Sequence, residues 1–205
     1  MALVKYNNRS ILNVTALDSL SSGGMNLITT NTISSGVSSS SFTSNINSTY
    51  DTYIFKFINI HPASDSVNFT VNFRDGSSAF DATKTTTFFK AYNNEAGGGA
   101  STVNDFYSTT KDLAQSTSYQ NICDIVGADA DQSVSGKLFL FSPSSTTFVK
   151  QFMVVLNGYT SNDYAQTHYI AGHINVTAAI DGIDFKFASG NIDSGVIKMY
   201  GLSKS

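Results

Sequence analysis

Short apolar stretches of strand length run through the whole chain, and clusters of Ser, Thr, Asn and Gly separate them. The stretches favour β-branched and aromatic residues, which are typical of strands. Ten are expected to be strands: MNLITT, VSSSSFT, YIFKFINI, VNFTVNF, TTTFFKAY, VSGKLFLF, TFVKQFMVVL, HYIAGHINVT, IDFKF and GVIKMYG. No sustained three-to-four residue apolar period with helix caps occurs, and only residues 101–115 favour a helical turn. The pattern predicts an all-β antiparallel sandwich or barrel.

Period-two alternation predicts which side chains face the core. In residues 67–73 the odd positions are Val or Phe and the even positions are Asn or Thr, as a half-buried strand requires. The stretch at 53–60 differs because both of its faces are apolar. One face would carry Tyr53, Phe55 and Phe57, and the other Ile54, Ile58 and Ile60. We therefore expect its second face to be covered by a loop or by another chain.

Two units are expected along the chain. Residues 25–205 would form a single β-sandwich domain, because sandwiches of this length occur undivided. Residues 1–24 mix apolar and polar positions before a Ser-Ser-Gly-Gly hinge, which suggests an N-terminal docking arm. An edge strand of the same domain is the open alternative. The arm's candidate docking residues are Leu3, Val4, Tyr6, Ile11 and Leu12.

The C-terminal segment predicts a hairpin. Its two strands, IDFKF and GVIKMYGL, are joined by ASGNIDS. Gly190, Asn191 and Gly195 tolerate the positive φ angles that tight loops need.

Charge is scarce. Charged residues make up 13% of the chain, against about 25% in an average soluble protein. The net charge is −3 without a basic block, which argues against nucleic-acid binding. No secretory signal or membrane-length apolar stretch is recognised, so we expect synthesis in the cytoplasm and no membrane partner. The single Cys123 is expected to be a core residue.

The search for chemistry predicts no catalytic residue, no cofactor and no metal ligand. His168 and His173 lie an odd number of positions apart in one strand, so they should face opposite ways. Asp124, Asp129 and Asp131 do not follow the calcium-loop pattern and are interpreted as a solvated turn. A hydrolase would need paired acids. The carboxylates at 105, 112, 163, 181 and 184 occupy ordinary loop or strand-end contexts.

One loop resembles a recognition surface. Residues 157–169 place tyrosines among small polar residues, which provides contact area at low entropic cost. The candidate receptor-binding residues are Tyr159, Asn162, Asp163 and Tyr164. A hairpin with half-buried tyrosines is the alternative.

Four stretches carry a resemblance to a known group: MALVKYNNRSILNVTAL, LITTNTISSGVSSSSFTSNINSTYDTYIFKFINIHPASD, SPSSTTFV and AIDGIDFKFASGNIDSGVIKMYGL. The chain resembles the small virion structural proteins of tailed phages, common in marine and cyanobacterial phages. The likeness is strongest at STYDTYIFKFINI and SGNIDSGVIKMYGL, and it assigns no functional residues. It implies an exterior virion component and, with it, an all-β fold of the jelly-roll-like antiparallel sandwich type with an N-terminal arm, since jelly rolls are common in capsid proteins.

Three functions are compared. The favoured one is a non-enzymatic structural protein of the virion, either a head decoration or cement protein or a fibre subunit. Its partners would be itself, as a homotrimer, and other capsid or tail proteins. The alternative is a host-receptor or glycan-binding module of a tail fibre. The third, a hydrolase acting on surface polysaccharide, is disfavoured by the scarcity of acids.

Overall fold

Strands account for nearly all of the regular structure in the computed structural model, which describes residues 24–94, 96–97 and 106–203. Eleven strands occur in this part of the chain. They are β1 (Met25–Ile33), β2 (Ser40–Phe42), β3 (Thr52–Pro62), β4 (Val67–Arg74), β5 (Lys84–Asn94), β6 (Gln120–Val126), β7 (Val134–Phe141), β8 (Lys150–Tyr159), β9 (Tyr164–Ile174), β10 (Gly182–Phe187) and β11 (Ile192–Leu202). Each of the ten expected stretches overlaps a strand. Strand β6 was not predicted, because apolar and polar residues do not alternate regularly in its sequence QNICDIV.

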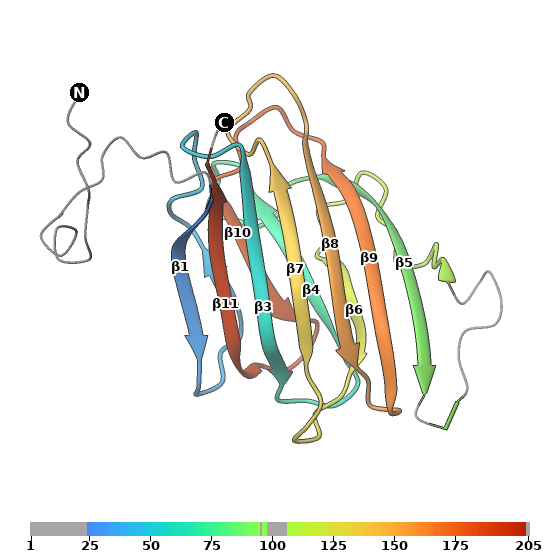
Figure 1. Cartoon of the computed structure of the whole chain (residues 1–205). Coiled ribbons are helices and arrows are strands. Elements are labelled where there is room, and N and C mark those ends of the chain that lie inside the picture. The colour runs from blue at the N-terminus through green and yellow to red at the C-terminus, as the bar shows by residue number, and fades with distance from the viewer. Residues whose placement is uncertain (1–23, 95, 98–105, 204–205) are drawn as a thin grey trace, which may run out of the picture.

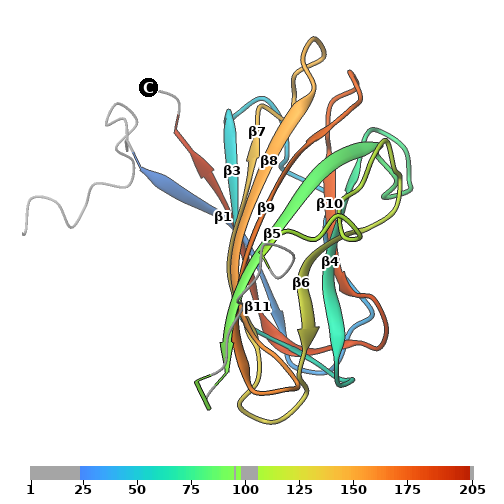
Figure 2. The same cartoon turned by 90° about the vertical axis from the view of Figure 1, so that its right-hand side faces the viewer.

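The strands form two antiparallel sheets packed face to face. The seven-stranded sheet has the order β1-β11-β3-β7-β8-β9-β5, and the four-stranded sheet has the order β2-β10-β4-β6. Figure 1 views the larger sheet from its outer side, and Figure 2 shows the two layers edge on. The predicted all-β sandwich is confirmed.

Strand pairing is nested. The first strand pairs with the last (β1 with β11), and β2 pairs with β10, β3 with β7, and β4 with β6. The remaining strands, β8, β9 and β5, extend the larger sheet beyond β7. The chain therefore folds back on itself as one long paired ribbon wrapped into two layers.

The C-terminal hairpin prediction is wrong. β10 pairs with β2 and β4 in one sheet, whereas β11 pairs with β1 and β3 in the other. The connection between them crosses between layers, because the apolar side of each strand is buried against the opposite sheet. The expected backbone freedom does occur at Gly190 (φ 71°) and Gly195 (φ 134°), but Asn191 is not among the positive-φ residues.

Phenylalanine rings from both sheets fill the centre of the sandwich. The Phe185 ring of β10 lies 4.9 Å from that of Phe57 and 5.6 Å from that of Phe55, measured between centroids. Phe69 and Phe42 of the same sheet complete the cluster, at 6.2 and 6.3 Å from Phe185. All five rings are buried, and each buried phenylalanine contributes about 1.5–3 kcal/mol by leaving water.

A bulge corrects the predicted faces of β3. Phe57 is opposite Gly136 and Ile60 is opposite Val134, so β3 has one extra residue at this point. Asn59, with φ 49°, absorbs it. Ile60 consequently turns into the core and is fully buried, whereas Ile58 stays on the outer face at 41% exposure.

The four-stranded sheet is also less open to water than its alternation predicted. The odd residues of 67–73 are buried as expected, but Thr70 and Asn72 are buried as well. The Asn72 amide donates to the Thr117 carbonyl at 2.9 Å, and its oxygen accepts from the buried Lys84 ammonium at 2.7 Å. Contacts with distant residues therefore bury part of a strand face whose polar residues the alternation assigned to solvent.

The described residues contain no helix of the length and apolarity that crossing a membrane requires.

Candidate functional site

The outer face of the seven-stranded sheet carries a continuous row of apolar side chains. Five residues follow one another across neighbouring strands in register: Leu27 of β1, Tyr200 of β11, Ile54 of β3, Phe139 of β7 and Met153 of β8. We call them the outer row. Tyr200 and Phe139 flank Ile54 on both sides and leave it only 6% exposed. Side chains of the neighbouring strands therefore cover Ile54, whereas Ile58 on the same face of β3 stays exposed.

The two ends of the outer row remain open to water. Leu27 is 56% exposed and Met153 is 49% exposed. One step along the strands, Tyr169 and Phe89 lie opposite each other on β9 and β5, also about half exposed. Phe89 stacks on Tyr107 with 4.9 Å between ring centroids. Contiguous apolar surface of this kind is a mark of an interaction site.

Three lysines lie side by side next to the outer row. Lys56 of β3 is directly opposite Lys198 of β11 on one side and Lys137 of β7 on the other. We call them the lysine row. Lys56 lies over the Tyr200 ring and Lys137 over the Phe139 ring, each 5.2 Å from the centroid. Within the described residues no carboxylate lies within ion-pair distance of any of the three.

The loops at one end of the sandwich are acidic. These loops follow β3, β6, β8 and β10, at the lower end in Figure 1. Five exposed carboxylates lie there or at the start of β11: Asp65, Asp129, Asp131, Asp163 and Asp193. We call this the acidic end. Residues 63–66, 127–133, 160–163 and 188–193 contain no Lys or Arg, so these loops carry net negative charge, as do the loops with the exposed Asp51 and Asp81 at the other end.

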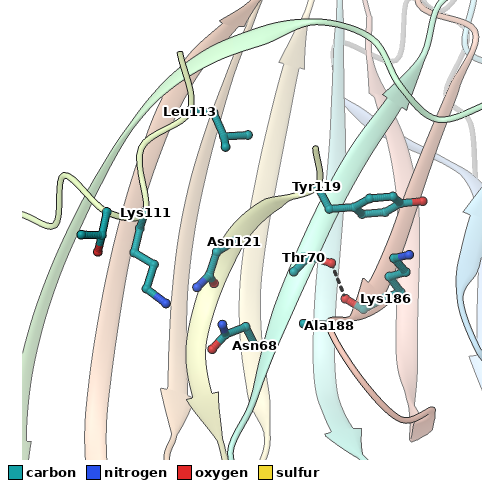
Figure 3. Close-up of a pocket in the computed structure, with 9 residues that line it drawn as sticks. Asn68, Thr70, Lys111, Leu113, Tyr119, Asn121, Lys186 and Ala188 are labelled. Carbon is teal, nitrogen blue, oxygen red and sulfur yellow. Dashed lines mark hydrogen bonds between the residues drawn. The ribbon is translucent and has the colours of Figure 1, made fainter. Parts of the chain in front are cut away.

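A groove crosses the outer face of the four-stranded sheet. It consists of two hollows of about 380 and 420 Å³, which share Tyr119, Lys186 and Ala188 as lining residues. In Figure 3, Lys111 and Asn121 approach the first hollow from one side, and Tyr119 and Lys186 from the other. The Lys186 ammonium lies 4.0 Å from the centroid of the Tyr119 ring. We call this feature the small-sheet groove.

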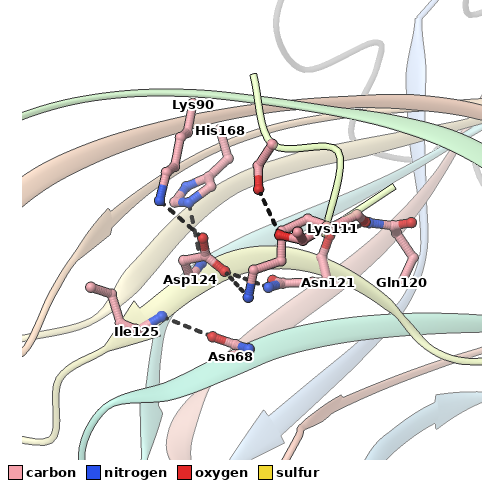
Figure 4. A network of polar contacts seen from close by, with 10 residues as sticks. Asn68, Lys90, Lys111, Gln120, Asn121, Asp124, Ile125 and His168 are labelled. Atoms are coloured by element: carbon pink, nitrogen blue, oxygen red, sulfur yellow. Dashed lines mark hydrogen bonds and ion pairs between the residues drawn. The ribbon is translucent and has the colours of Figure 1, made fainter. Parts of the chain in front are cut away.

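A buried polar network lies beneath one wall of this groove (Figure 4). The Asp124 carboxylate of β6 receives Lys90 and Lys111, each at 3.2 Å, and the amide of Asn121. Burial raises the pKa of Asp124, but the two ammonium groups and the amide outweigh it, so the pKa lies below its ordinary value. The interpretation of Asp124 as part of a solvated turn is wrong, because β6 carries it between the sheets. Asp129 and Asp131 do lie exposed in the following loop.

His168 of β9 closes the network from the larger sheet. Its Nε2 accepts the backbone N–H of Asp124 at 3.1 Å, which requires an unprotonated Nε2. Burial lowers the pKa of His168 to about 4, against the attraction of Asp124. The ring is therefore neutral near pH 7. His173 lies on the opposite face, as its odd spacing from His168 predicted.

The predicted receptor residues lie at the turn between β8 and β9. Asn162 and Asp163 are exposed, and Asp163 has φ 60°. Tyr159 and Tyr164 are half-buried, and the Tyr164 ring meets Tyr92 edge-on at 5.3 Å. This turn lies at the acidic end, opposite the end of the sheet where β1 begins (Figure 1). The predicted arm residues Leu3, Val4, Tyr6, Ile11 and Leu12 lie outside the described residues.

Three of the candidate acids for hydrolysis are held by neighbouring groups, and Asp105 lies outside the described residues. Asp184 accepts from Tyr119 at 2.8 Å and from Ser41 at 2.5 Å. Asp112 accepts from Tyr107 and the Phe88 backbone N–H, and Asp181 pairs with Arg74. Within residues 24–94, 96–97 and 106–203, no group of three His, Cys, Asp or Glu residues is placed to bind a metal ion. Cys123 is buried, as expected.

The lysine row, the acidic end and the small-sheet groove were not predicted from the sequence. Each combines residues from segments far apart in the chain, which only strand register and loop position bring together. A search of protein-family models finds no match to the chain, and a search of curated proteins finds none either.

Proposed function

We propose that this chain is a non-enzymatic exterior structural protein of a tailed-phage virion, either a head decoration or cement protein or a fibre subunit. The observation that carries the proposal is the outer row, a continuous apolar strip across the larger sheet with both ends exposed. Large exposed apolar patches are uncommon on monomers that stay alone in solution. The sequence resemblance to small tailed-phage virion proteins supports the same function.

The charges beside the outer row favour a particular mode of assembly. If two outer faces met around a two-fold axis, two rows of three lysines would be brought together, which is unfavourable. The acidic end of another copy offers the opposite charge. We therefore favour a head-to-tail contact between the outer face of one copy and the acidic end of the next. Contacts of this type close into rings, of which the homotrimer is an example.

The nested strand pairing supports a jelly-roll topology. When β5, β8 and β9 are set aside, eight strands remain. Counted along the chain, the first of these pairs with the eighth, the second with the seventh, the third with the sixth and the fourth with the fifth. Wrapping such a ribbon into two sheets produces the paired Greek keys of a jelly roll, an architecture common in capsid proteins. The N-terminal residues 1–24 would attach the sandwich to other virion proteins.

The test is the mass of the protein in solution by analytical ultracentrifugation. The wild type should be an oligomer, and Tyr169→Asp should reduce its mass to that of the monomer, because the change places a charge on the exposed outer face. Phe148→Asp is the matched control, since Phe148 is 73% exposed in the loop before β8 and belongs to neither sheet. A monomeric wild type would contradict the proposal.

A host-receptor or glycan-binding module of a tail fibre remains the second candidate. The small-sheet groove favours it, because amide, hydroxyl, lysine and tyrosine side chains line a hollow of ligand size. The turn with Asn162 and Asp163 provides exposed polar residues at the end opposite the start of β1, as a receptor-binding tip would. A fibre subunit could combine both functions.

A further inference from the structure

We propose that the small-sheet groove binds an acidic saccharide, with Lys186 contacting its carboxylate. This site is distinct from the assembly surface of the proposed function, because the groove lies on the outer face of the opposite sheet. The saccharide-binding proposal and the structural proposal are therefore independent of each other.

The size and shape of the groove suit a chain of sugar rings. Each hollow, about 380 and 420 Å³, lies within the range of small-ligand sites, and the shared residues Tyr119, Lys186 and Ala188 make the two continuous. The groove crosses β10 from the side of β2 to the side of β6, and is open to solvent along this path. An extended ligand could therefore occupy both hollows at once.

The lining alternates polar groups with apolar surface, as a sugar does. Amides of Asn68 and Asn121 and the hydroxyl of Ser41 face ring hydroxyls, while Leu113, Ala188 and the Tyr119 ring offer apolar contact to C–H groups. The Asn121 amide nitrogen donates to Asp124 and its oxygen is buried, so Asn121 shapes the wall of the first hollow and Asn68 supplies the more accessible amide.

The positive charge of Lys186 at the centre of the groove favours a negatively charged ligand. Lys186 has no carboxylate within ion-pair distance in the part of the chain that the structure describes. Its ammonium rests against the Tyr119 ring at 4.0 Å, which holds it in place but leaves its hydrogen-bond donors available. The nearby Asp184 carboxylate, which accepts from Tyr119 and Ser41, also lines the second hollow and offsets part of the Lys186 charge there.

Lys111 adds positive charge at the far wall of the groove. It pairs with Asp124, which it shares with Lys90, so two ammonium groups face one carboxylate. With Lys186 and Asp184 included, three ammonium groups stand against two carboxylates, so the groove and this cluster carry a net charge of +1. A saccharide fits better than a simple anion, because the amides and apolar surfaces of the groove contact neutral parts of the ligand.

The test is titration of the isotope-labelled protein with trigalacturonate, followed by amide NMR. We expect shifts confined to the groove and millimolar or tighter binding. The carboxyl-reduced, neutral trisaccharide should bind about tenfold more weakly, and Lys186→Gln should cause a similar loss. Lys186→Arg, which keeps the positive charge at this position, is the matched control and should bind about as wild type. Ala188→Glu, which places a carboxylate in the groove, should abolish binding without altering the fold.

Four results would overturn the proposal. They are absence of groove shifts at millimolar trigalacturonate, equal binding of the neutral trisaccharide, unchanged binding by folded Lys186→Gln, and full competition by equimolar inorganic sulfate. None of these bears on the oligomer, whose mass tests the proposed structural function independently.

Discussion

Lys56 and Lys198 lie directly opposite each other on the central strands β3 and β11, and both are on the outer face of the larger sheet. Like charges in directly opposed positions destabilise a sheet. The surrounding Tyr200 ring accommodates Lys56 by a cation–π contact, but no carboxylate among the described residues neutralises the pair. A partner surface with carboxylates facing these lysines would relieve this repulsion.

Charge reversal should dissect the proposed head-to-tail contact. We expect Lys56→Glu with Lys137→Glu to reduce the wild-type oligomer to monomers, and Asp129→Lys with Asp131→Lys to do the same. Each variant retains one intact surface with reversed charge on the other. An equimolar mixture of the two should therefore recover complexes, which mass measurement detects. If the mixture stays monomeric while both variants are folded, the pairing of these two surfaces is wrong.

Two neighbouring residues of β3 should respond in opposite ways to aspartate. Phe57 is 2% exposed in the core, so Phe57→Asp buries an unpaired charge and should cost more than about 4 kcal/mol of folding free energy. Ile58 is 41% exposed on the outer face, so Ile58→Asp should unfold near the wild-type temperature. Thermal unfolding monitored by circular dichroism compares them. A normal melting curve for Phe57→Asp would contradict the assignment of that face to the core.

Acid should destabilise the sandwich through His168. The pKa of His168 is about 4 in the fold against 6.5 in the unfolded chain, so the unfolded chain binds the proton first as the pH falls. Stability is complete above pH 6.5 and decreases between pH 6.5 and 4, by about 3 kcal/mol at most. Denaturant unfolding at a series of pH values measures this slope. In His168→Gln the slope over this window should be shallower, and an unchanged slope would exclude His168 as its source.

The glycine beside the β3 bulge should not tolerate a side chain. Gly195 has φ 134°, and a Cβ there would lie 2.7 Å from the carbonyl oxygen of Asn59. Gly195→Ala should therefore lose about 1–3 kcal/mol of unfolding free energy. Gly76→Ala is the control, because Gly76 also has positive φ (92°) but no atom within 4 Å of an added Cβ. Chemical denaturation should show the larger loss at Gly195, and equal losses would mean that the close approach is unimportant.

Removal of residues 1–20 should separate docking from folding. The strands from Met25 onward form both sheets, so the shortened chain should melt as the wild type does and keep its oligomeric mass. It should no longer bind to virus particles that lack this protein, which co-sedimentation measures. Loss of folding in the shortened chain would instead place these residues within the domain.

The sequence by itself determined the fold class and most of the strands. Alternation in residues 67–73 predicted the core-facing side chains correctly, because the period of two is local to the strand. The same local pattern predicted opposite faces for His168 and His173 and a buried Cys123. It missed β6, where register irregularities opposite β4 and the positive φ of Ile125 interrupt the alternation.

Tertiary structure decided everything that depends on distant segments. The bulge at Asn59 turned Ile60 into the core, and the crossing after β10 placed the two C-terminal strands in different sheets. The lysine row arises because three strands that are not adjacent in sequence pair in one register, and Asp124 is buried because two lysines from other segments reach it. The alternation of side chains along a strand depends only on that strand's own residues. The register between strands and the sheet that each strand joins depend on the whole chain, because the stable arrangement is the one that buries the most apolar surface while its polar groups stay paired.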